Sequence, residues 1–226
     1  MTERELFLAL EEAVSSRDAS VFEALFRSVD DRTIRPEDAV RALAKGVEKV
    51  RLSFRDGRVS IPEFLLSIDV FRQGLKGLRF RAPEAALFGQ GERIVIGVVE
   101  GDTHDMGKNI VAAVLEASGY KVFDAGRDVS REVFLNLLAK EKPSLLALST
   151  MMSTPLEKMR EIIEWTRSLH PEVKVLVGGA PLDERIARAL GADGYAENAV
   201  TAPDEAARLL SAARRAEKAI PVPQSR

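Results

Sequence analysis

The sequence predicts an α/β protein in two parts, a helical bundle followed by a doubly wound parallel sheet. Before residue 80 the apolar residues recur at helical spacing, and no segment has the pattern of a strand. After residue 91, apolar runs that are typical of buried strands alternate with helical segments five times. Residues 81–91, which hold one proline and two glycines, separate the two patterns.

Composition excludes several classes of protein. Of the 226 residues, 46% are hydrophobic and 30% are charged, which is the balance of a globular protein. With 33 Lys and Arg against 35 Asp and Glu, the net charge of -2 excludes a generally basic nucleic-acid binder. The absence of cysteine excludes disulfides, iron–sulfur clusters and a cysteine nucleophile, and two histidines are too few for a site with several histidine ligands. No apolar run approaches the ~20 residues of a membrane span and the charged N-terminus is unlike a signal peptide, so we expect a cytoplasmic protein.

Four helices are predicted in the first part. Pro36 is typical of the first turn of the third helix, Asp56-Gly57 ends that helix, and Pro62 begins the fourth. The apolar residues expected on the helices are Leu6, Leu10, Ala13 and Val14, then Val21, Leu25 and Phe26, then Val40, Leu43, Val47, Val50 and Phe54, and finally Leu65, Leu66, Ile68, Phe71, Leu75 and Leu78. Short helices in this order predict a four-helix bundle.

Five strands, each followed by a helix, are predicted in the second part. The strands are residues 94–99, 120–126, 145–149, 173–179 and 192–197. The helices are residues 110–117, 130–140, 155–168, 183–190 and 202–216. This alternation predicts a flavodoxin-like, doubly wound, five-stranded parallel sheet, with the short segment 192–197 at an edge. Such a sheet binds ligands beyond the carboxyl ends of its strands.

The domain boundaries follow from these patterns. We expect a helical domain over residues 1–82, a linker over 83–91, an α/β domain over 92–217 and a tail over 218–226. The last residues, IPVPQSR, are expected to be disordered.

The loops at the carboxyl ends of the strands carry the candidate functional residues. They are residues 100–109 (EGDTHDMGKN), 124–128 (DAGRD), 149–154 (STMMST) and 178–181 (GGAP). Asp102 lies two positions before His104, close enough to accept a hydrogen bond from one ring nitrogen. A carboxylate there fixes the tautomer and raises the basicity of the other nitrogen, which suits a metal ligand or a general base. The structural alternative is a surface histidine in a turn whose aspartate caps the next helix.

The other residues of these loops also have two interpretations. The hydroxyls are hydrogen-bond donors at the edge of the sheet or parts of a turn, and they belong to Ser149, Ser153 and Thr154. Gly178-Gly179 is an ordinary turn or a place where a ligand meets bare backbone. Met151 and Met152 would ordinarily fill gaps in a core. His170 ends a helix, where a cation suits the helix dipole, and no site role is expected for it.

Taken together, these loops resemble the cobalamin-binding domain family, whose fingerprint is D-x-H-x-x-G, then S-x-L, then G-G. Here the three elements are residues 102–107, Ser149-Thr150-Met151 and Gly178-Gly179, each on the strand where the family has it. The surrounding words GKNIV, DAGRDV and GADGYAE are also similar to the family.

The resemblance implies a cobalamin cofactor with His104 as the lower ligand of cobalt, in place of the cofactor's own benzimidazole. Asp102 would hold His104, and the small groups at Ser149, Gly178 and Gly179 would leave a slot for the displaced nucleotide tail. The residues implied to bind the cofactor are Asp102, Thr103, His104, Asp105, Met106, Gly107, Ser149, Met151, Ser153, Thr154, Gly178 and Gly179.

The N-terminal helices carry a second resemblance. Residues 57–78 are similar to the final cap helix of corrinoid proteins of methyltransferase systems and of cobalamin-dependent methionine synthase. The resemblance implies that the helices shield the upper face of the cofactor, with Phe71 as a candidate contact, and that they move when a partner presents its substrate. Plain bundle core is the alternative for Phe71.

The sequence departs from the family's pattern in three places. Met151 stands where the family usually has Leu, and Val70-Phe71 stand where relatives commonly have Ala-Met. Some relatives extend the Asp–His pair with a hydroxyl six residues after Ser149, and that residue is Pro155 here. Ser153 or Thr154 could replace this hydroxyl, or the relay could stop at Asp102.

The function that these resemblances imply is a methyl carrier, which is not a catalyst on its own. It would move a methyl group, as methylcobalamin, between a substrate-specific methyltransferase and a second methyltransferase, with a reductive activation protein as a further partner and no nucleic-acid or membrane partner. The alternatives are a cobalamin-dependent sensor or regulatory module, the small subunit of an adenosylcobalamin mutase, and a signalling domain without cofactor. The methyl donor is not readable from this chain.

Overall fold

The structure is a computed structural model that describes residues 2–27, 35–79 and 92–219. The predicted linker, residues 83–91, and residues 220–226 of the predicted tail lie outside the described residues. The chain divides into two compact units, residues 1–92 with 112–121 and residues 93–111 with 122–226, and each is described by itself.

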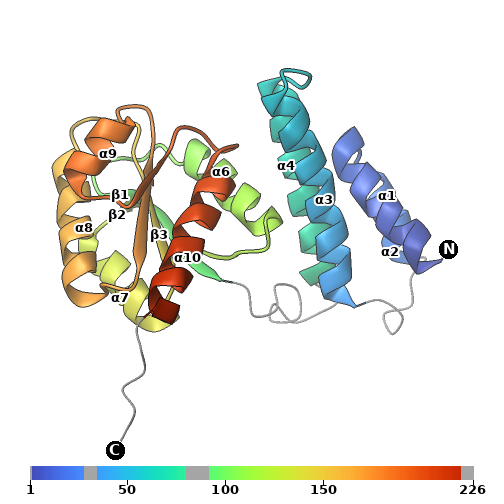
Figure 1. Ribbon diagram of the computed structural model, residues 1–226. Helices are drawn as coiled ribbons and strands as arrows, with labels where there is room; N and C mark the ends of the chain where they lie inside the picture. Colours follow the sequence, from blue (N-terminus) through green and yellow to red (C-terminus); the bar gives the residue numbers. More distant parts are fainter. Residues whose placement is uncertain (1, 28–34, 80–91, 220–226) are drawn as a thin grey trace, which may run out of the picture. The chain divides into compact units, whose positions relative to one another are not determined.

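The helical unit begins with the four predicted helices, α1 (Glu3–Ser16), α2 (Val21–Arg27), α3 (Pro36–Arg55) and α4 (Ile61–Arg79) (Figure 1). Thr2 and Glu5 form a capping box, in which the Thr2 hydroxyl accepts from the Glu5 backbone and the Glu5 carboxylate accepts from the Thr2 backbone. Pro36 stands in the first turn of α3, and Asp56 caps its end, as the sequence predicts.

The bundle core follows the predicted apolar faces with two exceptions. The predicted face of α1 is buried in full, and so are Val40, Leu43, Val47 and Val50 of α3. In α2, however, the buried side chain is Phe22, one residue after Val21. In α4, Leu66 is 55% exposed, because it lies two residues from both Phe64 and Ile68 and therefore on the opposite face of the helix.

The α/β unit contains the five predicted parallel strands. These are β1 (Arg93–Val99), β2 (Lys121–Val129), β3 (Leu145–Ser149), β4 (Lys174–Gly178) and β5 (Gly194–Ala196). Their order in the sheet is β2-β1-β3-β4-β5, which is the flavodoxin-like order, and β5 lies at an edge as predicted. The direction of winding reverses between β1 and β3, so a ligand crevice is expected above this pair.

The helices between and after these strands are α6 (Met106–Ala117), α7 (Arg131–Glu141), α8 (Leu156–Leu169), α9 (Glu184–Leu190) and α10 (Ala202–Ala219). Of α6, only the first turns, up to residue 111, belong to this unit, and the rest belongs to the helical unit. Figure 1 shows α7, α8 and α9 on one face of the sheet and α10 on the other. The face under α7, α8 and α9 is filled by apolar side chains such as Val95, Leu146, Phe134 and Ile163, which are all fully buried. α6 begins four residues before the predicted start, directly behind His104, and this brings the helix to the edge of the candidate site.

Candidate functional site

The loop between β1 and α6 is held in place by the end of β2. The backbone N–H of Gly101 donates to the Asp128 carboxylate at 2.7 Å, and the Asp128 N–H donates to the Asp102 carbonyl oxygen at 3.0 Å. Asp128 has a φ of 53°, a left-handed conformation that is uncommon for a residue other than glycine. These two hydrogen bonds fix the backbone on which the Asp102 side chain stands.

Asp102 and His104 interact as the sequence predicts. One carboxylate oxygen, Oδ1, accepts from the His104 backbone N–H at 2.9 Å and lies 2.7 Å from the ring nitrogen Nδ1. Because an ionised carboxylate only accepts hydrogen bonds, Nδ1 carries the ring hydrogen and Nε2 keeps the lone pair. The imidazole is 61% exposed while Asp102 is fully buried, so a buried anion orients an accessible nitrogen donor.

The second carboxylate oxygen of Asp102, Oδ2, is bound by the loop that follows β3. The Thr150 hydroxyl lies 2.8 Å from it and the Met151 backbone N–H lies 2.5 Å from it. Burial alone raises the pKa of Asp102, but the N–H groups of His104 and Met151 and the Thr150 hydroxyl stabilise the anion and hold that pKa well below its usual range. Asp102 is therefore ionised at neutral pH and bridges β1 and β3 at the point where the sheet order reverses.

Thr150 is the residue of this constellation that sequence reasoning missed. Ser153 and Thr154 were the candidates for a hydroxyl on Asp102, but both are exposed on the surface, and the hydroxyl that reaches Asp102 belongs to Thr150. The only available signal was that Thr150 occupies the variable position of the S-x-L element, directly after a buried strand. A role for Ser153 and Thr154 against the cofactor stays a prediction.

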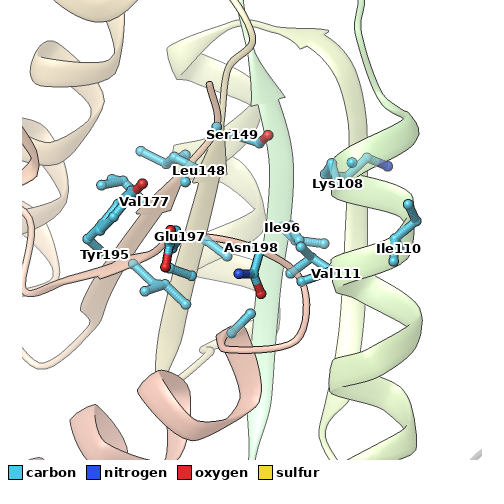
Figure 2. A pocket seen from close by; sticks show the side chains of 18 of the residues that line it. Ile96, Lys108, Ile110, Val111, Leu148, Ser149, Val177, Tyr195, Glu197 and Asn198 are labelled. Carbon is cyan, nitrogen blue, oxygen red and sulfur yellow. The ribbon is translucent and has the colours of Figure 1, made fainter. Parts of the chain in front are cut away.

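A slot of about 380 Å³ lies over the carboxyl halves of β3, β4 and β5 and beside Ile96 in the middle of β1. The strand register places Ser149, Gly178 and Ala196 side by side across the sheet, and all three line the slot. Figure 2 shows side chains from the strands and from α6 around this space. The apolar members of the lining include Ile96, Val111, Leu148, Leu176 and Val177.

Sequence reasoning named only part of this lining. Gly107, Ser149, Met151, Gly178 and Gly179 were predicted, and all five line the slot. Four polar or amphipathic residues were not singled out, and they are Lys108, Tyr195, Glu197 and Asn198. The Lys108 ammonium is buried and bound to Asp124 at 2.5 Å, and the Tyr195 hydroxyl donates to the Leu182 carbonyl oxygen at 2.9 Å. Three of the four belong to the segments GKNIV and GADGYAE, which are similar to the family but from which the sequence predicts no role for these residues.

The two glycines of the G-G element meet different neighbours. A Cβ on Gly178 would lie 3.0 Å from the Ala196 carbonyl oxygen, which is tight. Gly179 has a φ of +127°, and a Cβ there would lie 1.7 Å from the Thr150 carbonyl oxygen. Gly179 is thus required by the close approach of two loops, and the loop it supports is the one that binds Asp102.

The remaining predicted residues lie around this centre. Thr103, Met106 and Met151 are exposed, with 73% of Met106 and 48% of Met151 accessible. Asp105 is half-buried, and its carbonyl oxygen accepts from Asn109 in the first turn of α6. Phe71 is fully buried in the helical unit, which a residue of a bundle core also is, so its contact with a cofactor stays a prediction. His170 caps the end of α8, away from these loops.

Comparison with known proteins assigns the family. The B12 binding domain family matches residues 92–204, which include every loop described above. A corrinoid protein from Desulfitobacterium hafniense is 34% identical over 209 residues, covering 89% of this chain and 95% of that protein. The dimethylamine corrinoid protein from Methanosarcina barkeri is 33% identical over 213 residues, covering 93% of this chain and all of that one. The chain is a corrinoid protein of the B12 binding domain family.

Solved structures agree with this assignment. A cobalamin-binding protein from Desulfitobacterium hafniense superimposes with a TM-score of 0.68 at 28% identity, covering 90% of this chain and 98% of that one. A chain of the methanol:cobalamin methyltransferase complex MtaBC from Methanosarcina barkeri superimposes with a TM-score of 0.80 at 25% identity, covering 96% of this chain and 85% of that one. The helical bundle and the sheet are therefore both part of the corrinoid protein fold.

The residues of the site fit a corrinoid. With a corrinoid bound, His104 would supply a metal ligand from the protein, because its imidazole is 61% exposed and Asp102 holds Nδ1, which leaves Nε2 for the metal. Met151 and Gly107, which flank the Asp102–His104 pair, also line the slot, so a ligand above His104 can extend a chain into it. A long, mostly apolar slot suits a flat aromatic base such as the one that ends the nucleotide tail of cobalamin.

Proposed function

We propose that this corrinoid protein is a methyl carrier in which His104 binds cobalt from below and the slot lined by Ser149, Gly178 and Gly179 holds the nucleotide tail. The single observation that carries the proposal is the contact between Nδ1 of the exposed His104 and the buried carboxylate of Asp102 at 2.7 Å, beside a slot of about 380 Å³. When bound, the corrinoid supplies a cobalt centre that accepts a methyl group and gives it up again.

The residues of the chain would act on this centre through position and charge. Asp102 would fix the His104 tautomer and the orientation of the ring, so that the lone pair of Nε2 is available to the metal. Met106, two residues after His104, and Met151, whose N–H binds Asp102, have exposed apolar side chains against which a macrocycle could lie. We assign the transfer of the methyl group to partner proteins, because the relatives are corrinoid proteins and one of them forms part of a methyltransferase complex.

The proposed partners are methyltransferases. Support comes from the likeness to a chain of the MtaBC complex, which is a methanol:cobalamin methyltransferase, and from relatives that are named for dimethylamine. These relatives differ in the compound after which they are named, and we assign the choice of substrate to the partner. A substrate-specific methyltransferase and a second methyltransferase would share this carrier. A reductive activation protein would restore the reduced cobalt after accidental oxidation.

The helical unit is proposed to act as the cap over the upper face of the corrinoid. Its four helices also superimpose within the corrinoid protein fold, because the likeness to MtaBC covers 96% of this chain. The sensor alternative is not favoured, since relatives that match nearly the whole chain are named as corrinoid proteins. No helix in the described part of the chain is long and apolar enough to cross a membrane.

Methyl transfer tests the proposed function directly. The full chain is loaded with cobalamin, reduced, and mixed with a panel of methyl donors, each with and without a methyltransferase specific for that donor. We expect the absorption spectrum to change to that of a methylated corrinoid with one donor and only when its methyltransferase is present. Retention of cobalamin without methylation by any donor would contradict the carrier role while leaving cofactor binding intact.

A further inference from the structure

The loop after β3 is hydrogen-bonded to Asp102 through Thr150, which occupies the variable position of the family's S-x-L element. Thr150 is fully buried, and its hydroxyl lies 2.8 Å from Oδ2 of Asp102. The same hydroxyl is 3.2 Å from the Met152 N–H and 3.0 Å from the Met152 carbonyl oxygen. This hydroxyl therefore has one anionic acceptor, one neutral acceptor and one donor as neighbours.

The position of its hydrogen follows from these neighbours. A threonine hydroxyl has one hydrogen to donate, and two acceptors compete for it. A bond to an ionised carboxylate is about twice as strong as one to a neutral carbonyl, and the Asp102 oxygen is also the nearer of the two. Thr150 therefore donates to Asp102 and accepts from the Met152 N–H.

This arrangement divides the two oxygens of Asp102 between two loops. Oδ2 accepts hydrogen bonds from the Thr150 hydroxyl and the Met151 backbone N–H. Oδ1 accepts hydrogen bonds from the backbone N–H and the ring Nδ1–H of His104. A carboxylate held on both sides cannot rotate without breaking bonds in a site from which water is excluded, where an unmade hydrogen bond is costly. Asp102 therefore presents Oδ1 to His104 at one fixed angle.

We propose that Thr150 is a positioning residue that fixes the His104 ring and its Nδ1–H tautomer through Asp102. In this chain it supplies the hydroxyl whose expected position is occupied by Pro155, and it does so from within the element Ser149-Thr150-Met151. The link to cobalt rests on the proposed function, but the link from Thr150 to His104 is a property of the protein without cofactor. Because Met151 also lines the slot, the loop that holds the nucleotide tail is the loop that orients the metal ligand.

The two histidines of the chain make this inference testable in the full-length protein without cofactor. In 15N-labelled protein, at a pH where both rings are neutral, the two ring nitrogens of a histidine fixed in one tautomer give widely separated signals. We expect that pattern for His104 in the parent protein. Thr150→Val, which keeps the shape and removes the hydroxyl, should bring the two His104 signals toward each other as the second tautomer appears. Thr150→Ser should restore the separation.

Controls separate this effect from general damage. Thr166 is also fully buried, and its hydroxyl donates to the Ile162 carbonyl oxygen at 2.7 Å inside α8, so Thr166→Val removes a buried hydroxyl away from the site. It should leave His104 unchanged, and His170 should keep its signals in the Thr150 variants. His104 signals in Thr150→Val that match the parent would overturn the proposal.

Two further measurements cover the remaining outcomes. If Thr150→Val does not fold by circular dichroism, Thr150→Ala takes its place, and the Thr150 hydroxyl proton of the parent must exchange slowly with water. Fast exchange of that proton would overturn the proposal. With added hydroxocobalamin, Thr150→Val should bind but show a smaller spectral change on coordination of histidine than the parent. Failure of the parent to bind cobalamin would contradict the proposed function. The role of Thr150 would still be decided by the histidine signals, because those are measured without cofactor.

Discussion

Gly179 and Thr150 pack backbone against backbone, so closely that a Cβ on Gly179 would lie 1.7 Å from the Thr150 carbonyl oxygen. The Thr150 N–H in turn donates to the Gly178 carbonyl oxygen at 3.2 Å, which continues the pairing of β3 with β4 one residue beyond the end of β3. The glycine pair thus sets the position of the loop that binds Asp102. A glycine that leaves room for a ligand tail and a glycine that leaves room for a neighbouring loop give the same sequence pattern.

Gly179→Ala should therefore harm both the fold and the site. The left-handed conformation alone costs roughly 1–3 kcal/mol for a residue other than glycine, and the Thr150 loop must also move away. We expect a lower melting temperature and weaker retention of cobalamin. Gly191→Ala is the matched control, because Gly191 also has a positive φ of +86° but its Cβ would meet only side-chain atoms at 3.6 Å or more. Equal cobalamin binding by Gly179→Ala and the parent would contradict the close approach.

His104→Ala should remove the proposed lower ligand of cobalt. The expected results are a changed spectrum of bound cob(III)alamin, without the features of a coordinated imidazole, and faster loss of the cofactor on gel filtration. The folded protein should keep its stability, because the ring is 61% exposed. His170→Ala is the control and should behave as the parent does. A parental spectrum in His104→Ala would show that the cobalt ligand has been assigned to the wrong residue.

Asp102→Asn should reduce stability in a pH-dependent way. Four hydrogen bonds lower the pKa of the folded-state carboxyl below its unfolded value, so the stabilisation is present above the ordinary aspartate pKa near 3.8 and is lost as the pH falls toward the folded-state pKa. The amide brings donors toward donors, which costs about 1–3 kcal/mol at neutral pH. Urea unfolding of both proteins should give curves that differ at pH 7 and converge in acid. A difference that is the same at every pH would mean that Asp102 is not ionised in the folded protein.

Asp102→Asn should also weaken cobalamin retention, since loss of a carboxylate behind a metal-binding histidine typically costs about 10–100-fold in affinity.

Filling the slot should abolish the preference for a corrinoid with a nucleotide tail. Val111 is half-buried and lines the slot from α6, as Figure 2 shows, so Val111→Trp would occupy the space of the aromatic base. We expect the parent to bind cobalamin more tightly than cobinamide, which lacks the tail, and the ratio of the two affinities to fall toward one in the variant. Val133→Trp on the exposed surface of α7 should leave the ratio unchanged. A ratio that does not fall would show that the tail lies elsewhere.

Features that depend on neighbouring residues in the sequence could be predicted, whereas features that depend on contacts between distant segments could not. The strand 145–149 was predicted residue for residue, because a buried apolar run depends only on its own composition, and the Asp102–His104 contact was predicted because both residues stand in one loop. Thr150 was missed because its direction depends on how the chain turns after β3, which Gly179 decides from another strand. Leu66 was assigned to the wrong face because hydrophobicity was given more weight than its spacing from Phe64 and Ile68.

Removal of residues 1–85 tests the cap. His104, Thr150, Gly178 and Gly179 all lie in the segment that matches the B12 binding domain, residues 92–204, so the remaining chain should fold and bind cobalamin. If the helical unit shields the cofactor from solvent and slows the escape of the methyl group after photolysis, its removal should shorten two lifetimes. Methylcobalamin should photolyse faster, and the reduced cofactor should oxidise faster, in the shortened protein than in the full chain. Phe71→Ala in the full chain should cost about 3–5 kcal/mol of stability, because Phe71 is fully buried. Only a contact with the cofactor would also shorten the two lifetimes in this variant, so unchanged lifetimes would leave Phe71 as a residue of the bundle core. Equal lifetimes in the shortened and full-length proteins would show that the helical unit does not shield the cofactor. That result would favour the alternative of a cobalamin-dependent regulatory module.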